Sequence, residues 1–105
     1  MTVKLFPNDQ KSIAGKLADA ELHFTEGPLA GLRLLGFAVW EQRVGSERHV
    51  TYPARTYSVA GERRSFALLR PIEGTEDLQS VRQAILDAYA QFEKNGKRTL
   101  VITTT

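Results

Sequence analysis

The chain has 105 residues, of which 42% are hydrophobic and 25% charged, and its formal net charge is +2. This length and composition are typical of a single globular domain, here residues 1–105, with a core of moderate size. The absence of cysteine excludes disulfides, a thiolate nucleophile and a cysteine-ligated zinc site. No apolar run approaches the ~18 residues needed to cross a bilayer, and no secretory signal is recognisable, which favours a cytoplasmic location.

The first 40 residues predict three strands. Residues 2–6 form a short β-like run that ends at turn-forming residues. Residues 14–25 alternate between small or apolar and polar side chains, the pattern of a strand with one buried and one wet face. Residues 32–40 are apolar on both faces, which predicts a central or doubly covered strand, and Gly36 within this run indicates a bulge or bend.

The middle of the chain predicts further strands separated by turns. Strand character over residues 48–52 is interrupted by Pro53, because proline has no N–H to donate to a neighbouring strand. Residues 54–59 lead into a turn at residues 60–62, and residues 63–70 form the next strand, which Pro71 ends.

An amphipathic helix follows Thr75, whose hydroxyl is a candidate N-cap, and Asn95-Gly96 supplies its C-terminal stop. An apolar stripe recurs at spacings of three and four residues, so the helix is expected to pack on the sheet: Leu78, Val81, Ile85, Ala88, Tyr89 and Phe92. Residues 100–104 are rich in β-branched side chains and predict a last strand. We therefore predict an α+β fold, a curved antiparallel sheet of about five strands with one C-terminal amphipathic helix packed on it.

Sequence motifs for catalysis are missing. No serine lies in a glycine-flanked nucleophile elbow, and there is no phosphate-binding loop or dinucleotide-binding glycine motif. His23 shares a predicted strand face with Asp19 and Glu21, a set that could hold a metal ion or act in acid–base chemistry. A solvated polar face is the simpler interpretation, so we predict that the protein is not an enzyme and uses no cofactor or metal.

The centre of the chain is locally basic. From Arg43 to Arg70 there are six arginines and two glutamates, a net charge of +4, whereas the other eight basic and ten acidic residues give −2. Arginine forms forked hydrogen bonds to phosphate, and the tyrosines interleaved with these arginines could stack on unpaired bases. The alternative is that the arginines form the solvent face of strands and the tyrosines belong to the core. The predicted nucleic-acid contacts are Arg48, Tyr52, Arg55, Tyr57, Arg63, Arg64 and Arg70.

The order of these elements resembles the stage V sporulation protein G (SpoVG) family of small bacterial regulators over residues 2–92. Four stretches carry the resemblance: residues 12–24, residues 32–35 with Val50-Thr51-Tyr52-Pro53, Arg70-Pro71-Ile72, and residues 81–89. They correspond to the family's long second strand, its central hairpin ending in a proline, a proline corner and its helix. The resemblance implies an antiparallel sheet with a C-terminal helix, homodimers, and binding of DNA and RNA in gene regulation.

Two functions remain open on these grounds. The first is a cytoplasmic, bacterial nucleic-acid-binding regulator (DNA, RNA or both) that acts as a homodimer without catalysis. Trp40, in a strand that is apolar on both faces, fits a homodimer interface. The second is a protein–protein interaction or assembly module with no nucleic-acid role, whose exposed strand edges pair with another chain.

Overall fold

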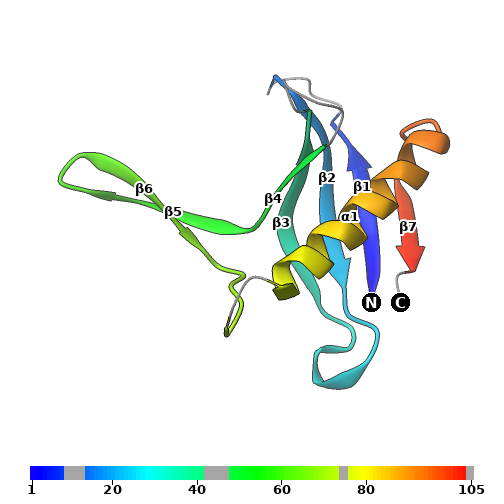
Figure 1. The fold of residues 1–105 in the computed structure, drawn as a ribbon, viewed down its shortest axis with the longest axis horizontal. Helices are drawn as coiled ribbons and strands as arrows, with labels where there is room; N and C mark the ends of the chain where they lie inside the picture. The colour runs from blue at the N-terminus through cyan, green and yellow to red at the C-terminus, as the bar shows by residue number, and fades with distance from the viewer. Residues whose placement is uncertain (9–13, 42–47, 74–75, 104–105) are drawn as a thin grey trace.

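The computed structural model describes residues 1–8, 14–41, 48–73 and 76–103. Figure 1 shows a body, in which one helix lies across a β-sheet, and a two-stranded arm that projects from this body. The elements of the described chain are β1 (Thr2–Pro7), β2 (Lys16–His23), the short 3-10 helix η1 (Gly27–Leu29), β3 (Arg33–Trp40), β4 (His49–Thr51), β5 (Ala54–Val59), β6 (Glu62–Ala67), α1 (Glu76–Lys94) and β7 (Leu100–Thr103).

Five of these strands form one open sheet in the order β4-β3-β2-β1-β7, and every neighbouring pair is antiparallel. The last strand of the chain, β7, pairs with the first, β1, so the two ends of the described chain lie side by side (Figure 1). The predicted α+β class, an antiparallel sheet of about five strands with one C-terminal helix, is confirmed. The prediction did not include that β5 and β6 form a separate two-stranded ribbon.

The hydrophobic core lies between the sheet and α1. Alternate side chains of the strands are buried on the side that the helix covers, as the alternation over residues 14–25 predicts. The apolar stripe of the helix is also confirmed, because its last four members are at most 2% exposed. The buried cluster consists of Val3, Leu5, Ala18, Ala20, Leu22, Phe37, Val39, Val50, Ile85, Ala88, Tyr89 and Phe92. Burial of each large member stabilises the fold by about 1.5–3 kcal/mol.

The helix ends where the sequence predicts. Gly96 has a φ of 75°, in the left-handed region that glycine adopts readily. The N–H of Lys97 donates to the carbonyl of Phe92 at 2.9 Å, and the N–H of Gly96 donates to the carbonyl of Glu93 at 3.2 Å. This pair of bonds is a Schellman motif, which satisfies the last free carbonyls of α1 and turns the chain back towards β7. The predicted N-cap, Thr75, lies outside the described residues.

A β-bulge in β3 confirms the prediction made at Gly36. Leu34 pairs with Leu22 and Phe37 pairs with Ala20, so two residues of β3 stand opposite the one intervening residue of β2. Gly36 has a φ of 105°, and a Cβ atom placed on it would lie 3.0 Å from the Cβ of Pro53. The missing side chain therefore makes room for the buried Pro53.

The arm begins immediately after Pro53. Its strands β5 and β6 are joined at Ala60 and Gly61, which have φ values of 52° and 79°, as expected for a tight two-residue hairpin turn. The predicted strand over residues 63–70 is wrong at its C-terminal end, because β6 stops at Ala67. The N–H of Leu68 still donates to the Pro53 carbonyl at 3.0 Å, but beyond Pro53 the opposing chain turns away into β4.

Substitution Gly36→Ala should lower the free energy of unfolding by about 2–4 kcal/mol, since it adds overpacking against Pro53 to a φ that other residues rarely adopt. Gly15→Ala is the matched control, because Gly15 has a φ of 84° and open space around it, so it should cost about 1–2 kcal/mol. Urea unfolding followed by circular dichroism measures both, and equal losses would mean that the contact with Pro53 adds nothing.

Candidate nucleic-acid interface

The arm is the most exposed element of the described chain, and it carries a net positive charge. Every residue of β5 and β6 is exposed, and the arm extends away from the sheet and helix (Figure 1). Residues 54–70 contain four arginines and one glutamate, a net charge of +3. Four of the predicted contact residues therefore lie on this projecting element or at its base: Arg55, Arg63, Arg64 and Arg70. Arg43, which belongs to the same basic stretch of sequence, lies outside the described residues.

The two strands of the arm place aromatic and basic side chains together on one face. Arg55 stands directly opposite Phe66, and Tyr57 stands directly opposite Arg64. Side chains two residues apart share a face of a strand, so these four residues form two neighbouring aromatic–arginine pairs. We call this side of the ribbon the aromatic face; it consists of Arg55, Tyr57, Val59, Glu62, Arg64 and Phe66.

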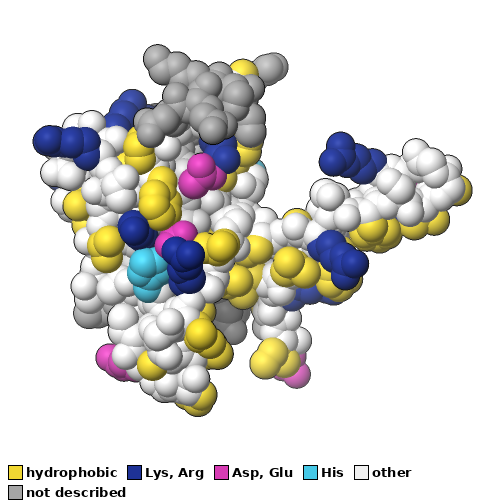
Figure 2. Space-filling view, turned by 180° about the vertical axis from the view of Figure 1, so that it is seen from behind, with side chains coloured by type: hydrophobic (Ala, Val, Ile, Leu, Met, Phe, Trp, Pro, Cys, Tyr) yellow, Lys and Arg dark blue, Asp and Glu magenta, His cyan; other side chains and the backbone are white. Residues whose placement is uncertain are grey.

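The aromatic rings of this face are open to solvent. Tyr57 is 42% exposed and Phe66 is 48% exposed. The guanidinium of Arg70 lies 5.0 Å from the centre of the Phe66 ring, within cation–π range, so Arg70 joins the same face from the base of the arm. Figure 2 shows hydrophobic and basic side chains next to one another along the arm.

The cations of the aromatic face remain available to a ligand. Among the described residues no carboxylate pairs with Arg55. Arg64 lies 3.4 Å from Glu62, but both side chains are exposed, and a surface ion pair of this kind contributes little.

The opposite face of the arm has a different character. It carries Ala54, Thr56 and Ser58 from β5, and Arg63, Ser65 and Ala67 from β6. Arg63 is therefore separated from Arg55 and Arg64 by the thickness of the ribbon, although it is adjacent to Arg64 in sequence. Of the three arginines in β5 and β6, Arg55 and Arg64 lie on the aromatic face and Arg63 lies on the opposite face.

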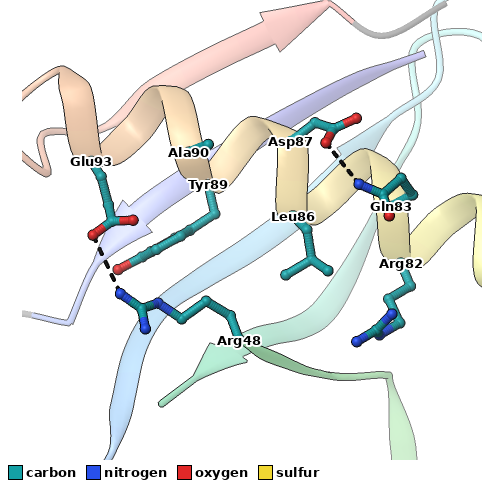
Figure 3. A pocket seen from close by; sticks show the side chains of 8 residues that line it. All are labelled: Arg48, Arg82, Gln83, Leu86, Asp87, Tyr89, Ala90 and Glu93. Carbon is teal, nitrogen blue, oxygen red and sulfur yellow. Dashed lines mark hydrogen bonds and ion pairs between the residues drawn. The ribbon is translucent and has the colours of Figure 1, made fainter. Parts of the chain in front are cut away.

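Arg48 lies outside the arm, against the helix. Its guanidinium is 3.5 Å from the carboxylate of Glu93 and 5.9 Å from the centre of the Tyr89 ring (Figure 3). Burial raises the pKa of Tyr89, whose hydroxyl end points towards this guanidinium. The surrounding shallow groove along α1 also contains Arg82 and Asp87, so it mixes both signs of charge.

Tyr52 is a packing residue in this structure. Its ring meets that of Phe37 edge to face, with the centres 6.1 Å apart, and burial raises its pKa.

Phe66, the second exposed ring of the aromatic face, is not among the contacts predicted from the sequence. The turn at Ala60 and Gly61 contains the necessary signal, because counting outwards from a two-residue turn places Phe66 opposite Arg55.

A polar cluster around Glu21 lies on the face of β2 opposite the one that α1 covers, and Figure 2 shows a histidine side chain beside acidic and basic groups. The Glu21 carboxylate accepts a hydrogen bond from His23 Nε2 at 2.7 Å and another from Arg33 at 3.3 Å, and Glu21 is only 7% exposed. Asp19 pairs instead with Lys16. Within the described ranges, no group of three or more histidine or carboxylate side chains is placed to hold a metal ion.

Comparisons with known proteins found no matching family model, no matching curated protein and no matching solved structure. The resemblance to the SpoVG family therefore stays a prediction from the sequence. Over the part of the chain that the structure describes, no helix is both long and apolar enough to span a membrane.

Replacement of Glu21 should change how stability depends on pH. Burial raises the pKa of this carboxyl, but the hydrogen bonds and charges of His23 and Arg33 outweigh burial and hold the pKa below its ordinary value of 4.5. The ionised carboxylate therefore stabilises the fold above this pH, and the stabilisation is lost as the pH falls through the lowered pKa. Glu21→Gln should be less stable at pH 7 and lose less stability on further acidification.

Urea unfolding at several pH values between about 7 and 3 tests this linkage. The matched control is Glu26→Gln, because Glu26 is an exposed carboxylate in the turn between β2 and β3. The control should lose stability in acid as the unmodified protein does. A Glu21→Gln profile parallel to that of the unmodified protein would contradict the assignment.

Proposed function

We propose that this protein is a cytoplasmic nucleic-acid-binding regulator that acts as a homodimer and performs no catalysis. The observation that carries the proposal is the aromatic face of the arm, where exposed rings and arginines alternate across two paired strands. Arginine offers planar, forked donors that match phosphate, and aromatic rings offer surfaces for bases. A two-stranded ribbon is also narrow enough to enter the major groove of duplex DNA.

Charge distribution supports a polyanionic ligand. Residues 54–70 carry a net charge of +3, whereas the remaining ten basic and eleven acidic residues of the chain give −1. The element that projects from the body (Figure 1), together with its base, thus carries a net positive charge. Such an arrangement attracts phosphate backbones to the arm and leaves the body nearly neutral towards them.

Removal of two arm charges should weaken nucleic-acid binding and its dependence on salt. For Arg55→Gln/Arg64→Gln we expect the slope of log K against log salt to fall in magnitude by roughly 0.7–0.9 per arginine that meets a phosphate. Fluorescence anisotropy with labelled DNA and RNA oligonucleotides, at low and raised salt, measures affinity and slope together.

The matched control removes the same two charges at the far end of α1, in Lys94→Gln/Arg98→Gln, where both side chains are exposed. This variant should keep the slope of the unmodified protein. Equal losses in the two double variants would indicate that only net charge matters, and an absence of binding at low salt would eliminate the proposed function.

The homodimer part of the proposal draws on exposed apolar side chains of the body. Leu35 in the interior strand β3 is 52% exposed, and Leu32 just before this strand is also exposed. Light scattering should give twice the 11.7 kDa mass of the chain, and Leu35→Glu should lower this value. Val101→Glu, at an equally exposed position on the outer strand β7, is the control and should leave the dimer intact. A monomeric unmodified protein would remove the homodimer from the proposal.

A protein-interaction or assembly module is the second candidate function. It is favoured by the apolar members of the arm and its base, since Val59, Leu68 and Ile72 are all exposed. It is also favoured by β7, an outer strand that pairs with β1 on one side, because strand edges can accept another chain. The double variant at Arg55 and Arg64 separates the candidates, because a protein partner seated on apolar side chains tolerates loss of these charges better than a phosphate backbone does.

A further inference from the structure

We propose that the aromatic face binds nucleic acid as a single strand, with one unpaired base stacked on Tyr57, a second on Phe66, and phosphates held by Arg55 and Arg64. This inference rests on the proposed function and specifies the class of its ligand. It is drawn from the register of the arm, the exposure of its rings and the position of Arg70.

The spacing of the rings fits separated nucleotides. Tyr57 and Phe66 are diagonal neighbours across the ribbon, because each stands directly opposite an arginine of the other pair. The backbone positions of diagonal neighbours on one face of an antiparallel pair lie about 7–8 Å apart. Nucleotides stacked along one strand of a duplex are only about 3.4 Å apart. Two adjacent bases can therefore meet the two rings when the strand is drawn out to roughly twice its stacked spacing, which a single strand permits.

The chemistry of the face also selects unpaired bases. In a duplex the faces of the bases are covered by their neighbours, so a protein ring reaches them only by forcing a base step apart. Tyr57 and Phe66 instead lie on a ribbon surface, and their rings are about half exposed. Such rings act as platforms for bases whose faces are already free.

Arg70 completes the second platform. Its guanidinium lies over the Phe66 ring at 5.0 Å, and a planar guanidinium stacks on bases as well as on aromatic rings. A base at this position meets the Phe66–Arg70 pair, whereas a base at the first position meets Tyr57 alone. Arg55 and Arg64 then flank the two platforms on opposite strands, which places one cation beside each base for the phosphate backbone.

The charge of the arm argues for nucleic acid over a protein partner on this face. Three arginines belong to the face or lie over it: Arg55, Arg64 and Arg70. The face itself, all of whose residues are described, contains one carboxylate, that of Glu62. An apolar protein surface would leave these cations to be desolvated without partners, which is costly. A nucleic-acid strand supplies a partner for each, phosphates for Arg55 and Arg64 and a base for Arg70.

The test compares a labelled 20-nucleotide single strand of mixed sequence with a hairpin duplex of the same sequence by fluorescence anisotropy, as DNA and as RNA, at one fixed, low salt concentration. We expect at least tenfold tighter binding of the single strand. Tyr57→Leu and Phe66→Leu, which keep apolar area but remove the ring, should each weaken single-strand binding by roughly 5- to 100-fold, the effect of losing one base–aromatic stack.

Two matched controls isolate the ring. Tyr57→Phe keeps the aromatic face and should bind as the unmodified protein does. Val101→Ala shortens an apolar side chain of similar exposure, 52%, on β7 outside the arm, and should also have no effect. Circular dichroism confirms that each variant is folded, and all three positions changed are exposed, so the core is untouched.

The outcomes separate this inference from the proposed function. If duplex binds as tightly as single strand and the leucine variants behave like Val101→Ala, while loss of Arg55 and Arg64 still weakens binding, the single-strand inference is overturned and the proposed function stands. If neither form binds at low salt, both are overturned. Tighter single-strand binding that is lost in the leucine variants and retained in Tyr57→Phe supports the inference.

Discussion

The contact between Gly36 and Pro53 determines the shape of this protein. The bulge in β3 places Gly36 where a Cβ atom would come within 3.2 Å of the Pro53 backbone, so Pro53 approaches β3 more closely than a side chain at position 36 would allow. Because Pro53 has no N–H, it cannot extend the pairing of β4, and the chain leaves the sheet at this residue. The arm thus leaves the sheet at the point where one glycine in the neighbouring strand makes room for Pro53. The hydrogen bond from Leu68 to the Pro53 carbonyl closes the base of the arm at the same point.

This departure separates the exposed arm from the hydrophobic core. The buried cluster is formed by the sheet and α1, and no side chain of β5 or β6 belongs to it. A two-stranded hairpin is marginally stable by itself, so the arm depends on its anchorage at Pro53 and on whatever covers its apolar side chains. Its rings and arginines contribute nothing to the core, and they lie where a ligand reaches them without disturbing the body. The position of such residues on the arm is therefore more informative about function than the same residues in the sheet would be.

The sequence predicted those features that depend on local pattern. The helical stripe ending in Phe92, the bulge at Gly36 and the break at Pro53 all follow from spacing or from the backbone limits of one residue. The roles of Arg48 and Tyr52 could not be predicted in this way, because each depends on a partner distant in sequence or on another strand, Glu93 and Phe37 respectively. Alternation over residues 54–59 indicates which side chains share a face, but it does not reveal whether that face is covered. Alternation also does not reveal that a polar side chain is buried: Glu21 lies on the polar face of β2, yet it is only 7% exposed.

The two halves of the proposed function, self-association and nucleic-acid binding, are linked by the small size of the aromatic face. One arm offers two base platforms and three arginines, a footprint of about two nucleotides, since each exposed ring accepts one base. An isolated footprint of this size gives weak, salt-sensitive binding, because phosphate contacts lose affinity as salt rises. In the proposed homodimer, a second arm that met the same strand would bind it in an intramolecular event with a high effective concentration. A homodimer thus turns a small exposed face into a useful binding surface without any residue beyond those on the arm.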